Sequence, residues 1–522
     1  MAESLVWLVP LLPWLAAAWI GIGWLLGRNR GEAGERGTAW MASGAALLSL
    51  LILLVLDIQA LWTGAAPGQV VLGQWLASGE YQVLVSFALD GYALVVATLV
   101  AFIGLLVTRF SVNYLHRETG FQRFFMILSL FTGAMLLIVL AGNAALAFVG
   151  WELAGVSSYL LIAYAYQRPV ATINATRAFL SNRIGDAGFL FGLFLCLHLL
   201  GTLEWDGLAR GADELGQLSA ALVAAGFLLA AFAKSAQVPF APWIARALEG
   251  PTPSSALFYG ALMVHAGVYL VIRLEPLLMQ TPVLLALLVL VGGLTALYGF
   301  LGGLVQTDVK SVLMFSTSAQ VGLMFLACGL GWFELAAWHL VLHGAWRAFQ
   351  FLSAPALMHL MHRPTRPVPA WLRGRRWLHT AALQRFWLDP LANWLLVRPT
   401  LALARDVRAF DEHVVNRMVG LPASISLMSS LAQWEQRKQL KGGVLDGDTG
   451  DVGRARGAAG HLMEWIASGL QWFEERLVLR GGEQGLQTLI QRLGTYLTEV
   501  ERLLSHPRYL LLVILATFVV IL

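Results

Sequence analysis

The stretch AKSAQVPFAPWIARALEGPTPSSAL, residues 233–257, decides the fold of this chain. It begins at the end of a long apolar run, so Lys234 is expected at membrane depth. Pro239 and Pro242 follow shortly after, and a proline removes a backbone donor and clashes with the preceding turn. We therefore expect the helix that carries Lys234 to break or kink just after it. Broken helices at membrane depth commonly frame ion sites.

The rest of the chain has the composition of a polytopic membrane protein. Of its 522 residues, 58% are hydrophobic and 13% are charged, and the mean hydropathy is +0.68, whereas a soluble domain carries roughly a quarter charged residues. Since about 20 apolar residues span a bilayer as a helix, the predicted fold class is an all-α polytopic membrane protein of about 12 transmembrane helices, eleven of them consecutive and the last one detached. The predicted spans are 5–27, 39–63, 89–109, 121–141, 143–166, 185–201, 216–236, 254–274, 281–303, 309–330, 332–360 and 507–522.

The positions of arginine predict the orientation. The loops after the first, third and fifth spans are rich in Arg, whereas residues 64–88 contain neither Lys nor Arg. The positive-inside rule then puts the N-terminus outside and the segment after the eleventh span in the cytoplasm. The N-terminus has no basic leader or cleavage site, so the first helix is expected to be retained. The arginines used are Arg28, Arg30, Arg36, Arg109, Arg117, Arg123, Arg168, Arg177 and Arg183.

Three parts are expected along the chain. Residues 1–363 are predicted to form the transmembrane bundle, 364–506 a cytoplasmic or interfacial segment of amphipathic helices, and 507–522 a C-terminal transmembrane helix. Within the second part, the Gly- and Asp-rich stretch 441–457 is predicted to be a flexible linker. The Trp-rich helices around it are typical of helices that lie on lipid headgroups. The alternative is a docking platform for a partner subunit.

Lysine is scarce, which makes two lysines informative. Arg accounts for 31 of the 35 basic residues, and Lys234 and Lys310 are the only lysines before the last hundred residues. Arg stays protonated in proteins, whereas a desolvated ammonium group can lose its proton near neutral pH. A buried Lys can therefore relay a proton. The alternative for Lys310 is a side chain that snorkels from the end of its helix.

Further titratable residues fall inside predicted spans, where such groups are costly and usually paired. Glu152 lies in the fifth span and His265 in the eighth, and Asp308 is a possible ion-pair partner of Lys310. Each of these residues alone is also explained by a static hydrogen bond between helices.

A stripe of titratable residues is predicted in the eleventh span. His339, His343 and Arg347 recur every four residues, which stacks them on one face of a helix. Because the titratable residues lie on five different spans, they predict a polar axis through the bundle that carries protons or sodium ions. The predicted pathway contains Glu152, Lys234, His265, Asp308, Lys310, His339, His343 and Arg347, with the helix break at Pro239 and Pro242.

No motif for catalysis or for a cofactor is found. The sequence has no Gly-rich phosphate loop, dinucleotide-binding fingerprint, Cys cluster or Ser-His-Asp spacing. His339 and His343 have the spacing of two metal ligands, but no carboxylate or third His is nearby to complete a site. We expect no metal, no cofactor and no enzymatic activity in this chain by itself.

Residues 233–257 resemble, nearly residue for residue, the core signature of the proton-translocating antiporter family, which includes the large membrane subunits of respiratory complex I and the Mrp cation/proton antiporters. The resemblance covers roughly residues 85–360 and includes GWELAGVSSYLLI around Glu152, DVKSVLMFSTSAQVG around Lys310 and the stretch HGAWRAFQFL. It implies an antiporter-like helix bundle with inverted repeats and a broken helix. It also implies that Lys234 exchanges protons, that Glu152 modulates its charge, and that Lys310 and His343 belong to the connecting axis.

The chain departs from the family pattern at three places. Tyr259 stands where the family often has His, with His265 six residues later, and Arg347 stands where it usually has Lys. The family's large subunits continue after the eleventh span with further spans and a second broken helix, whereas this chain goes directly to its tail. Within that tail, residues 386–420 resemble the C-terminal region of the complex I L subunit.

A shortened chain of this kind resembles the membrane subunit of the Dab-type inorganic-carbon accumulation complexes. This resemblance implies a soluble partner on the cytoplasmic side that is similar to a zinc-dependent carbonic anhydrase, with the zinc in the partner. Cation flux would then make the hydration of carbon dioxide one-directional, so that bicarbonate accumulates. One alternative is a proton-pumping subunit of a complex I-like or Mrp-type assembly. Another is a membrane scaffold whose charges are structural. Membrane lipids are expected partners, and nucleic acid is not.

Overall fold

The computed structural model describes residues 3–79, 81–260, 263–360 and 367–411. The chain divides into two compact units, Met1–Thr400 and Leu401–Leu522. Of the second unit, the described part is short and belongs to α19 (Arg398–Phe410) and the residue after it. The predicted linker 441–457, the helices around it and the C-terminal helix 507–522 lie outside the described residues.

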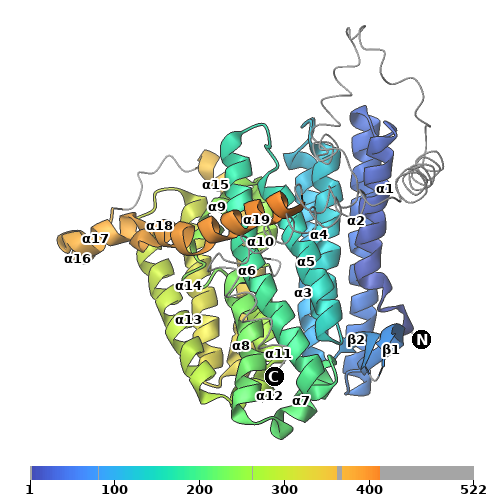
Figure 1. The fold of residues 1–522 in the computed structure, drawn as a ribbon. Coiled ribbons are helices and arrows are strands. Elements are labelled where there is room, and N and C mark those ends of the chain that lie inside the picture. Colours follow the sequence, from blue (N-terminus) through green and yellow to red (C-terminus); the bar gives the residue numbers. More distant parts are fainter. Residues whose placement is uncertain (1–2, 80, 261–262, 361–366, 412–522) are drawn as a thin grey trace, which may run out of the picture. The chain divides into compact units, whose positions relative to one another are not determined.

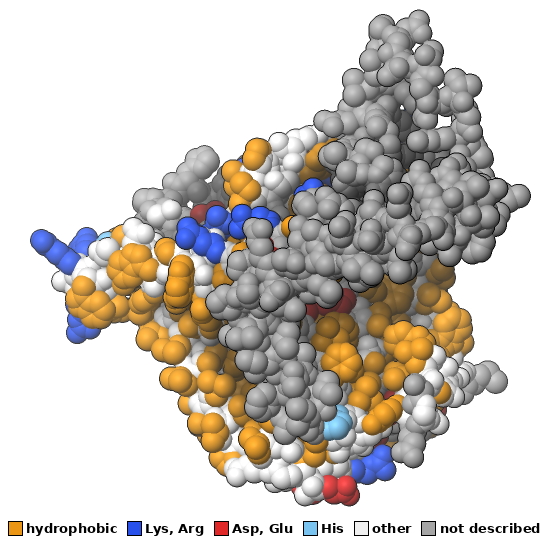
Figure 2. Space-filling view, in the orientation of Figure 1, with side chains coloured by type: hydrophobic (Ala, Val, Ile, Leu, Met, Phe, Trp, Pro, Cys, Tyr) orange, Lys and Arg blue, Asp and Glu red, His pale blue; other side chains and the backbone are white. Residues whose placement is uncertain are grey.

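The first unit is a bundle of long helices that run side by side (Figure 1). Figure 2 shows hydrophobic side chains over the flank of this bundle, with charged ones gathered toward the ends of the helices. The bundle and its broken helix confirm the predicted class of a polytopic helical membrane protein, but not the predicted number of about 12 spans. Its helices are α1 (Leu8–Leu25), α2 (Gly31–Thr63), α3 (Gly91–Tyr114), α4 (Phe121–Leu140), α5 (Ala144–Ile162), α6 (Pro169–Leu200), α7 (Trp205–Gly211), α8 (Gln217–Lys234), α9 (Pro242–Arg246), α10 (Thr252–Gly260), α11 (Ala266–Arg273), α12 (Glu275–Met279), α13 (Pro282–Gly303), α14 (Val309–Gly329) and α15 (Phe333–Leu360).

Within the described residues, nine helices are long and apolar enough to cross a membrane. Three of the twelve predicted spans are missing from this set for different reasons. The span predicted at 254–274 is interrupted, and the span at 507–522 lies outside the described residues. The span at 332–360 forms α15, which is long enough, but its polar stripe lowers the hydropathy.

The break after Lys234 has a clear physical basis. Helix α8 ends at Lys234, Ala236 has a φ of +50°, and the Val238–Pro239 peptide bond is cis. Backbone groups at a helix end need other partners, and side chains supply them here. The indole of Trp243 donates to the carbonyl of Ala233 at 2.8 Å, and the backbone N–H of Val238 donates to the hydroxyl of Thr295 at 3.0 Å.

A second break divides the predicted span 254–274, which we expected to be one continuous helix. Helix α10 ends at Gly260, and α11 begins at Ala266. No proline marks this position, so the sequence carried no signal for it. A Cβ at Gly260 would lie 2.6 Å from the Cβ of Ala348, so the end of α10 packs directly against α15.

Helix α6 is longer than the predicted span 185–201. It begins at Pro169, so Arg177 and Arg183 belong to a helix and not to a loop, and their use as loop residues was wrong. Pro169 occupies the first helical turn, where its missing N–H costs nothing. Charged residues in the first half of α6 hid this helix, because a hydropathy criterion assigns such residues to loops.

Residues 64–88, predicted only as a loop without basic residues, contain most of a β-hairpin. Strand β1 (Gly68–Ser78) pairs antiparallel with β2 (Tyr81–Leu89), and Val70 lies opposite Phe87. The carboxylate of Glu204 holds the hairpin to the bundle, because it accepts hydrogen bonds from Gln69, Ser86 and Asn143.

Three short helices follow the bundle within the first unit: α16 (Ala370–Gly374), α17 (Arg376–Leu383) and α18 (Leu388–Ala392). In Figure 1 they cross one end of the long helices. Leu372 and Ala382 pack with Leu301 and Val305 of the α13 end. The guanidinium of Arg246, on α9, forms an ion pair with Asp389 at 2.6 Å. This segment is thereby joined to the broken-helix region that follows Lys234.

Candidate functional site

Lys234 is buried at the end of α8, with 1% of its surface exposed. Its ammonium donates a hydrogen bond to the backbone carbonyl of Trp151 at 3.2 Å and lies 4.9 Å from the centroid of the Trp151 ring. One carbonyl and one aromatic face are weak partners for a buried cation. The charge of Lys234 therefore depends on the ionised groups around it.

Those ionised groups form a cluster on α5 and α6. Glu152 forms an ion pair with Arg183, and Arg183 also reaches Asp186 at 3.4 Å. Asp186 is 4% exposed and accepts a hydrogen bond from the indole of Trp151 at 3.0 Å. Trp151 links Asp186 to Lys234, because its indole donates to Asp186 and its backbone carbonyl accepts from Lys234. We call Glu152, Arg183, Asp186 and Lys234 the charge cluster.

Two cations approach one point in this cluster. A Cβ built on Gly155 would lie 3.5 Å from the Nζ of Lys234 and 3.9 Å from the Nη2 of Arg183. Two like charges at such short range are tolerated only beside compensating carboxylates, which Glu152 and Asp186 provide. We predicted correctly that Glu152 and Lys234 lie in helices. We did not predict Asp186 as a member of the site or Arg183 as the ion-pair partner of Glu152. The available signal was an Asp three residues after an Arg in an otherwise apolar segment.

A second group of predicted residues meets where α11 contacts α15. The Nε2 of His265 lies 2.9 Å from the Nδ1 of His343, and the Nε2 of His343 lies 3.3 Å from the Nε of Arg347. Arg347 also donates to the hydroxyl of Ser316 at 2.9 Å. His265, His343 and Arg347 are all buried. His339 is hydrogen-bonded to Gln320 at 2.8 Å and not to His343, although its ring lies edge-on to that of His343 with the centroids 6.0 Å apart.

Arg347 determines the tautomers of both histidines. A guanidinium only donates hydrogen bonds, so the Nε2 of His343 must be an acceptor. The proton of a neutral His343 is then on Nδ1 and is donated to the Nε2 of His265. A neutral His265 in turn carries its proton on Nδ1, a buried atom without a hydrogen-bond partner in the described part of the chain.

Further buried polar atoms without partners lie near the broken helix. Within the described ranges they include the Oγ of Ser235 and the Oε1 of Gln237. A Cβ on Gly267 would clash with the hydroxyl of Ser235, so this hydroxyl lies next to the start of α11 and close to His265. Buried polar groups in proteins are normally satisfied by protein or water.

Lys310 and Asp308 lie apart from both groups. The carboxylate of Asp308 caps α14 by accepting from the backbone N–H of Ser311 at 2.8 Å. Among the described residues Asp308 and Lys310 form no ion pair, although we had considered them possible partners. Lys310 is half-buried in the first turn of α14. Tyr259, which stands where the family often has His, donates to the carbonyl of Ile244 at 2.6 Å.

The same residues bear on metal binding. In the part of the chain that the structure describes, no three His, Cys, Asp or Glu side chains come together as metal ligands. The Nε2 of His265 and the Nδ1 of His343 are hydrogen-bonded to each other, so neither nitrogen is available to a metal ion.

The fold and these buried charges define a multi-pass membrane protein of the antiporter-like class. Residues 141–370 match the transmembrane family of NADH:quinone oxidoreductase and Mrp antiporters, and residues 75–125 match the N-terminus of complex I chain 5. Through these residues the chain belongs to the family of the complex I L subunit and the Mrp antiporters.

Curated relatives and solved structures agree with this assignment. The chain is 36% identical to chloroplastic NAD(P)H-quinone oxidoreductase subunit 5 of Zygnema circumcarinatum, over 68% of this chain and 51% of the relative. It is 41% identical to NADH-quinone oxidoreductase subunit L of Mycobacterium tuberculosis, over 55% and 46%. The chain thus spans about half the length of the curated relatives that it matches.

Among solved structures, the chain is similar to the Mrp complex from Dietzia sp., with a TM-score of 0.57 and 29% identity over 66% of this chain and 37% of that one. It also has the fold of a chain in the membrane-bound sulfane sulfur reductase, an archaeal respiratory membrane complex, with a TM-score of 0.58 and 22% identity over 67% and 70%.

Proposed function

We propose that this chain conducts protons or sodium ions as the membrane subunit of a complex I-like or Mrp-type assembly. The observation that carries the proposal is the buried Lys234 at the end of a broken helix, together with Glu152, Arg183 and Asp186 of the charge cluster. Proteins with related sequences are subunits of such assemblies by name. The proposal includes a bacterial inner-membrane location, with a periplasmic N-terminus and residues 364–506 in the cytoplasm, and the arginine distribution supports this orientation.

Arg183 is the proposed control element for Lys234. It contacts both Glu152 and Asp186, so small movements of its guanidinium change how much negative charge faces Lys234. That charge decides whether Lys234 keeps or releases its proton. A released proton would travel through water near Ser235 and Gln237 to His265.

Arg347 is the proposed gate at the other end of the histidine pair. His343 can exchange a proton with His265 through Nδ1, but its Nε2 is occupied by Arg347, which does not give up a proton. Conduction beyond His343 therefore requires the guanidinium to move off Nε2, for instance toward Ser316, which it already contacts.

The test is flux through the intact complex in proteoliposomes, followed with a pH-sensitive dye and with sodium as a second arm. Lys234→Met removes the proposed exchanging group, and Arg210→Gln, at an exposed position of α7, is the matched control. Flux that depends on Lys234 but not on Arg210 supports conduction. Full flux in Lys234→Met would contradict the proposed ion conduction and favour the scaffold alternative, in which the buried charges are only structural.

A second candidate is the uptake of inorganic carbon. Two features support it. The match to the family ends at residue 370, and residues 386–420 are similar to the C-terminal region of the complex I L subunit. In this proposal, ion flow drives a zinc carbonic-anhydrase-like partner docked on the cytoplasmic side. Such a partner would supply the zinc chemistry, and this chain would supply the ion pathway.

Growth separates the two candidates. The chain and its genomic neighbour are co-expressed in cells that need high carbon dioxide, and growth in air is measured with wild type, Lys234→Ala and Glu152→Gln. Rescue by wild type alone supports inorganic-carbon uptake. Failure of an expressed, assembled wild-type complex leaves the respiratory or antiporter assembly as the function.

A further inference from the structure

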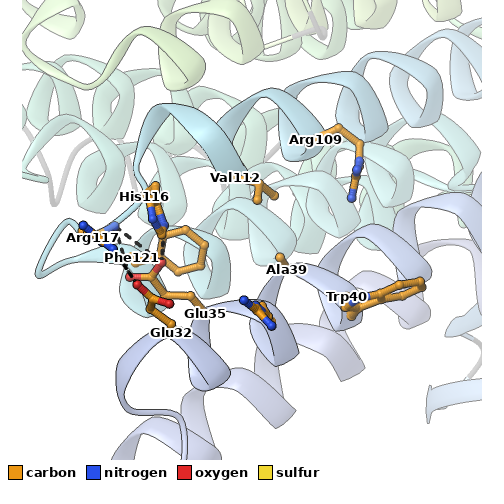
Figure 3. Close-up of a pocket in the computed structure, with 10 residues that line it drawn as sticks. Glu32, Glu35, Ala39, Trp40, Arg109, Val112, His116, Arg117 and Phe121 are labelled. Carbon is orange, nitrogen blue, oxygen red and sulfur yellow. Dashed lines mark hydrogen bonds and ion pairs between the residues drawn. The ribbon is translucent and has the colours of Figure 1, made fainter.

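A cavity of about 360 Å³ lies between the start of α2, the end of α3 and the start of α4, away from the charge cluster (Figure 3). Both Arg36 and Arg109 line it, from α2 and α3 respectively. These elements belong to the compact first unit and have no part in the proposed ion pathway. The cavity is lined by Glu32, Glu35, Arg36, Ala39, Trp40, Arg109, Val112, His116, Arg117 and Phe121.

The carboxylates of this cavity are already paired. Glu32 forms an ion pair with Arg117 at 2.7 Å. Glu35 lies 2.9 Å from the Nδ1 of His116 and accepts from the backbone N–H of Arg117 at 3.2 Å. Figure 3 shows these four side chains together at one end of the cavity. With three arginines against two glutamates, the cavity keeps a net positive charge whether or not His116 is protonated.

The other end of the cavity is cationic. In the part of the chain that the structure describes, neither Arg36 nor Arg109 has an ion-pair or side-chain hydrogen-bond partner. Both are exposed, and Ala39 and Val112 add apolar surface between them. Two guanidiniums at one cavity are suited to the oxygens of a phosphate, which they can bind with two hydrogen bonds each.

The depth of the cavity in the membrane indicates the source of that phosphate. Arg36 lies just before the apolar stretch of α2, which begins at Ala39, and Arg109 lies where the apolar stretch of α3 ends. Trp40 is 80% exposed at the same level, as is typical of a side chain at the boundary between headgroups and acyl chains. Basic pockets between transmembrane helices at this depth bind anionic headgroups.

We propose that this cavity binds the phosphodiester headgroup of an anionic phospholipid, with Arg36 and Arg109 on the phosphate and Trp40 against the glycerol and the upper acyl chains. Glu32 and Glu35 join the start of α2 to the residues that follow α3. The proposal is independent of what the bundle transports.

The test is native mass spectrometry of the intact detergent-purified protein, titrated with phosphatidylglycerol, phosphatidylcholine or inorganic phosphate. We expect one phosphatidylglycerol to bind in preference to phosphatidylcholine and to be retained against millimolar inorganic phosphate. Arg36→Gln/Arg109→Gln should weaken this binding roughly tenfold or more. Arg36→Lys/Arg109→Lys should keep much of it, and Arg210→Gln should leave it unchanged.

Two outcomes would overturn the proposal. One is unchanged phosphatidylglycerol binding in the double Gln variant, shown to be folded by its unchanged elution in size-exclusion chromatography. The other is displacement of the lipid by inorganic phosphate alone, which would make the cavity a site for a free anion. If the double Gln variant does not fold, the same lipid titration is carried out on Trp40→Leu, in which both arginines are intact. It should keep the preference for phosphatidylglycerol over phosphatidylcholine, and loss of that preference would contradict the assignment.

Discussion

The imidazoles of His265 and His343 contact each other at 2.9 Å, from the residue before α11 and the middle of α15. The contact exists because the predicted eighth span is broken, which brings the start of α11 against α15. Arg347 donates to the other ring nitrogen of His343, Nε2. Among the described residues, the Nδ1 of His265 is therefore the ring nitrogen of this pair that has no partner. The predictions below begin from this arrangement.

His343→Gln should abolish proton flux while the protein stays folded. A Gln side-chain oxygen can accept from Arg347 as the Nε2 of His343 does, but an amide does not relay protons. Flux in proteoliposomes and the thermal unfolding midpoint are measured together. His339→Gln is the matched control, because His339 lies outside the His265–His343 pair. Normal flux in His343→Gln would contradict the proposed route.

Arg183→Gln should destabilise the protein by about 1–3 kcal/mol, since it leaves two carboxylates without their cation in a partly buried site. Glu152→Gln in the same chain should restore part of this loss, because only one carboxylate then remains unpaired. A double-mutant cycle on unfolding measures the coupling. Additive effects would show that the Glu152–Arg183 ion pair does not contribute to stability.

Asp186→Asn should leave the fold intact and lower the flux. The amide oxygen can still accept from the indole of Trp151, whereas one negative charge of the charge cluster is lost. Asp213→Asn, in the exposed connection before α8, is the control for a charge change. The readouts are flux and circular dichroism, and a variant with wild-type flux would remove Asp186 from the mechanism.

Gly292→Ala should lower the unfolding midpoint, and Gly293→Ala should not. A Cβ at Gly292 would lie 2.5 Å from the backbone nitrogen of Leu326 on α14. A Cβ at Gly293 would lie 3.6 Å from the Cδ1 of Leu326, at the end of a flexible side chain. Small residues permit such close helix contacts in membranes. Since both changes gain the same helix propensity, the difference between the two midpoints reports the contact alone. Equal midpoints would contradict the close packing of α13 on α14.

Much of the fold was predictable because its signals are local. A run of about 20 apolar residues forms a helix in a bilayer whatever surrounds it, and Pro239 and Pro242 mark a break that the backbone requires. Where polar residues entered a helix, as in the first half of α6, the same criterion placed its boundary wrongly. The hairpin of β1 and β2 was missed because its pairing and its anchor, Glu204, are distant in sequence.

The sequence by itself determined which residue types lie inside the membrane: Glu152, Lys234, His265 and His343 are all in or at the ends of the predicted helices. Only the tertiary structure decided their partners. Glu152 is paired with Arg183 and not with Lys234, and the stripe of α15 divides, with His343 turned to His265 and His339 to Gln320. Helical spacing specifies which side chains share a face, whereas contacts between helices depend on breaks and close packing that involve residues far apart in the chain.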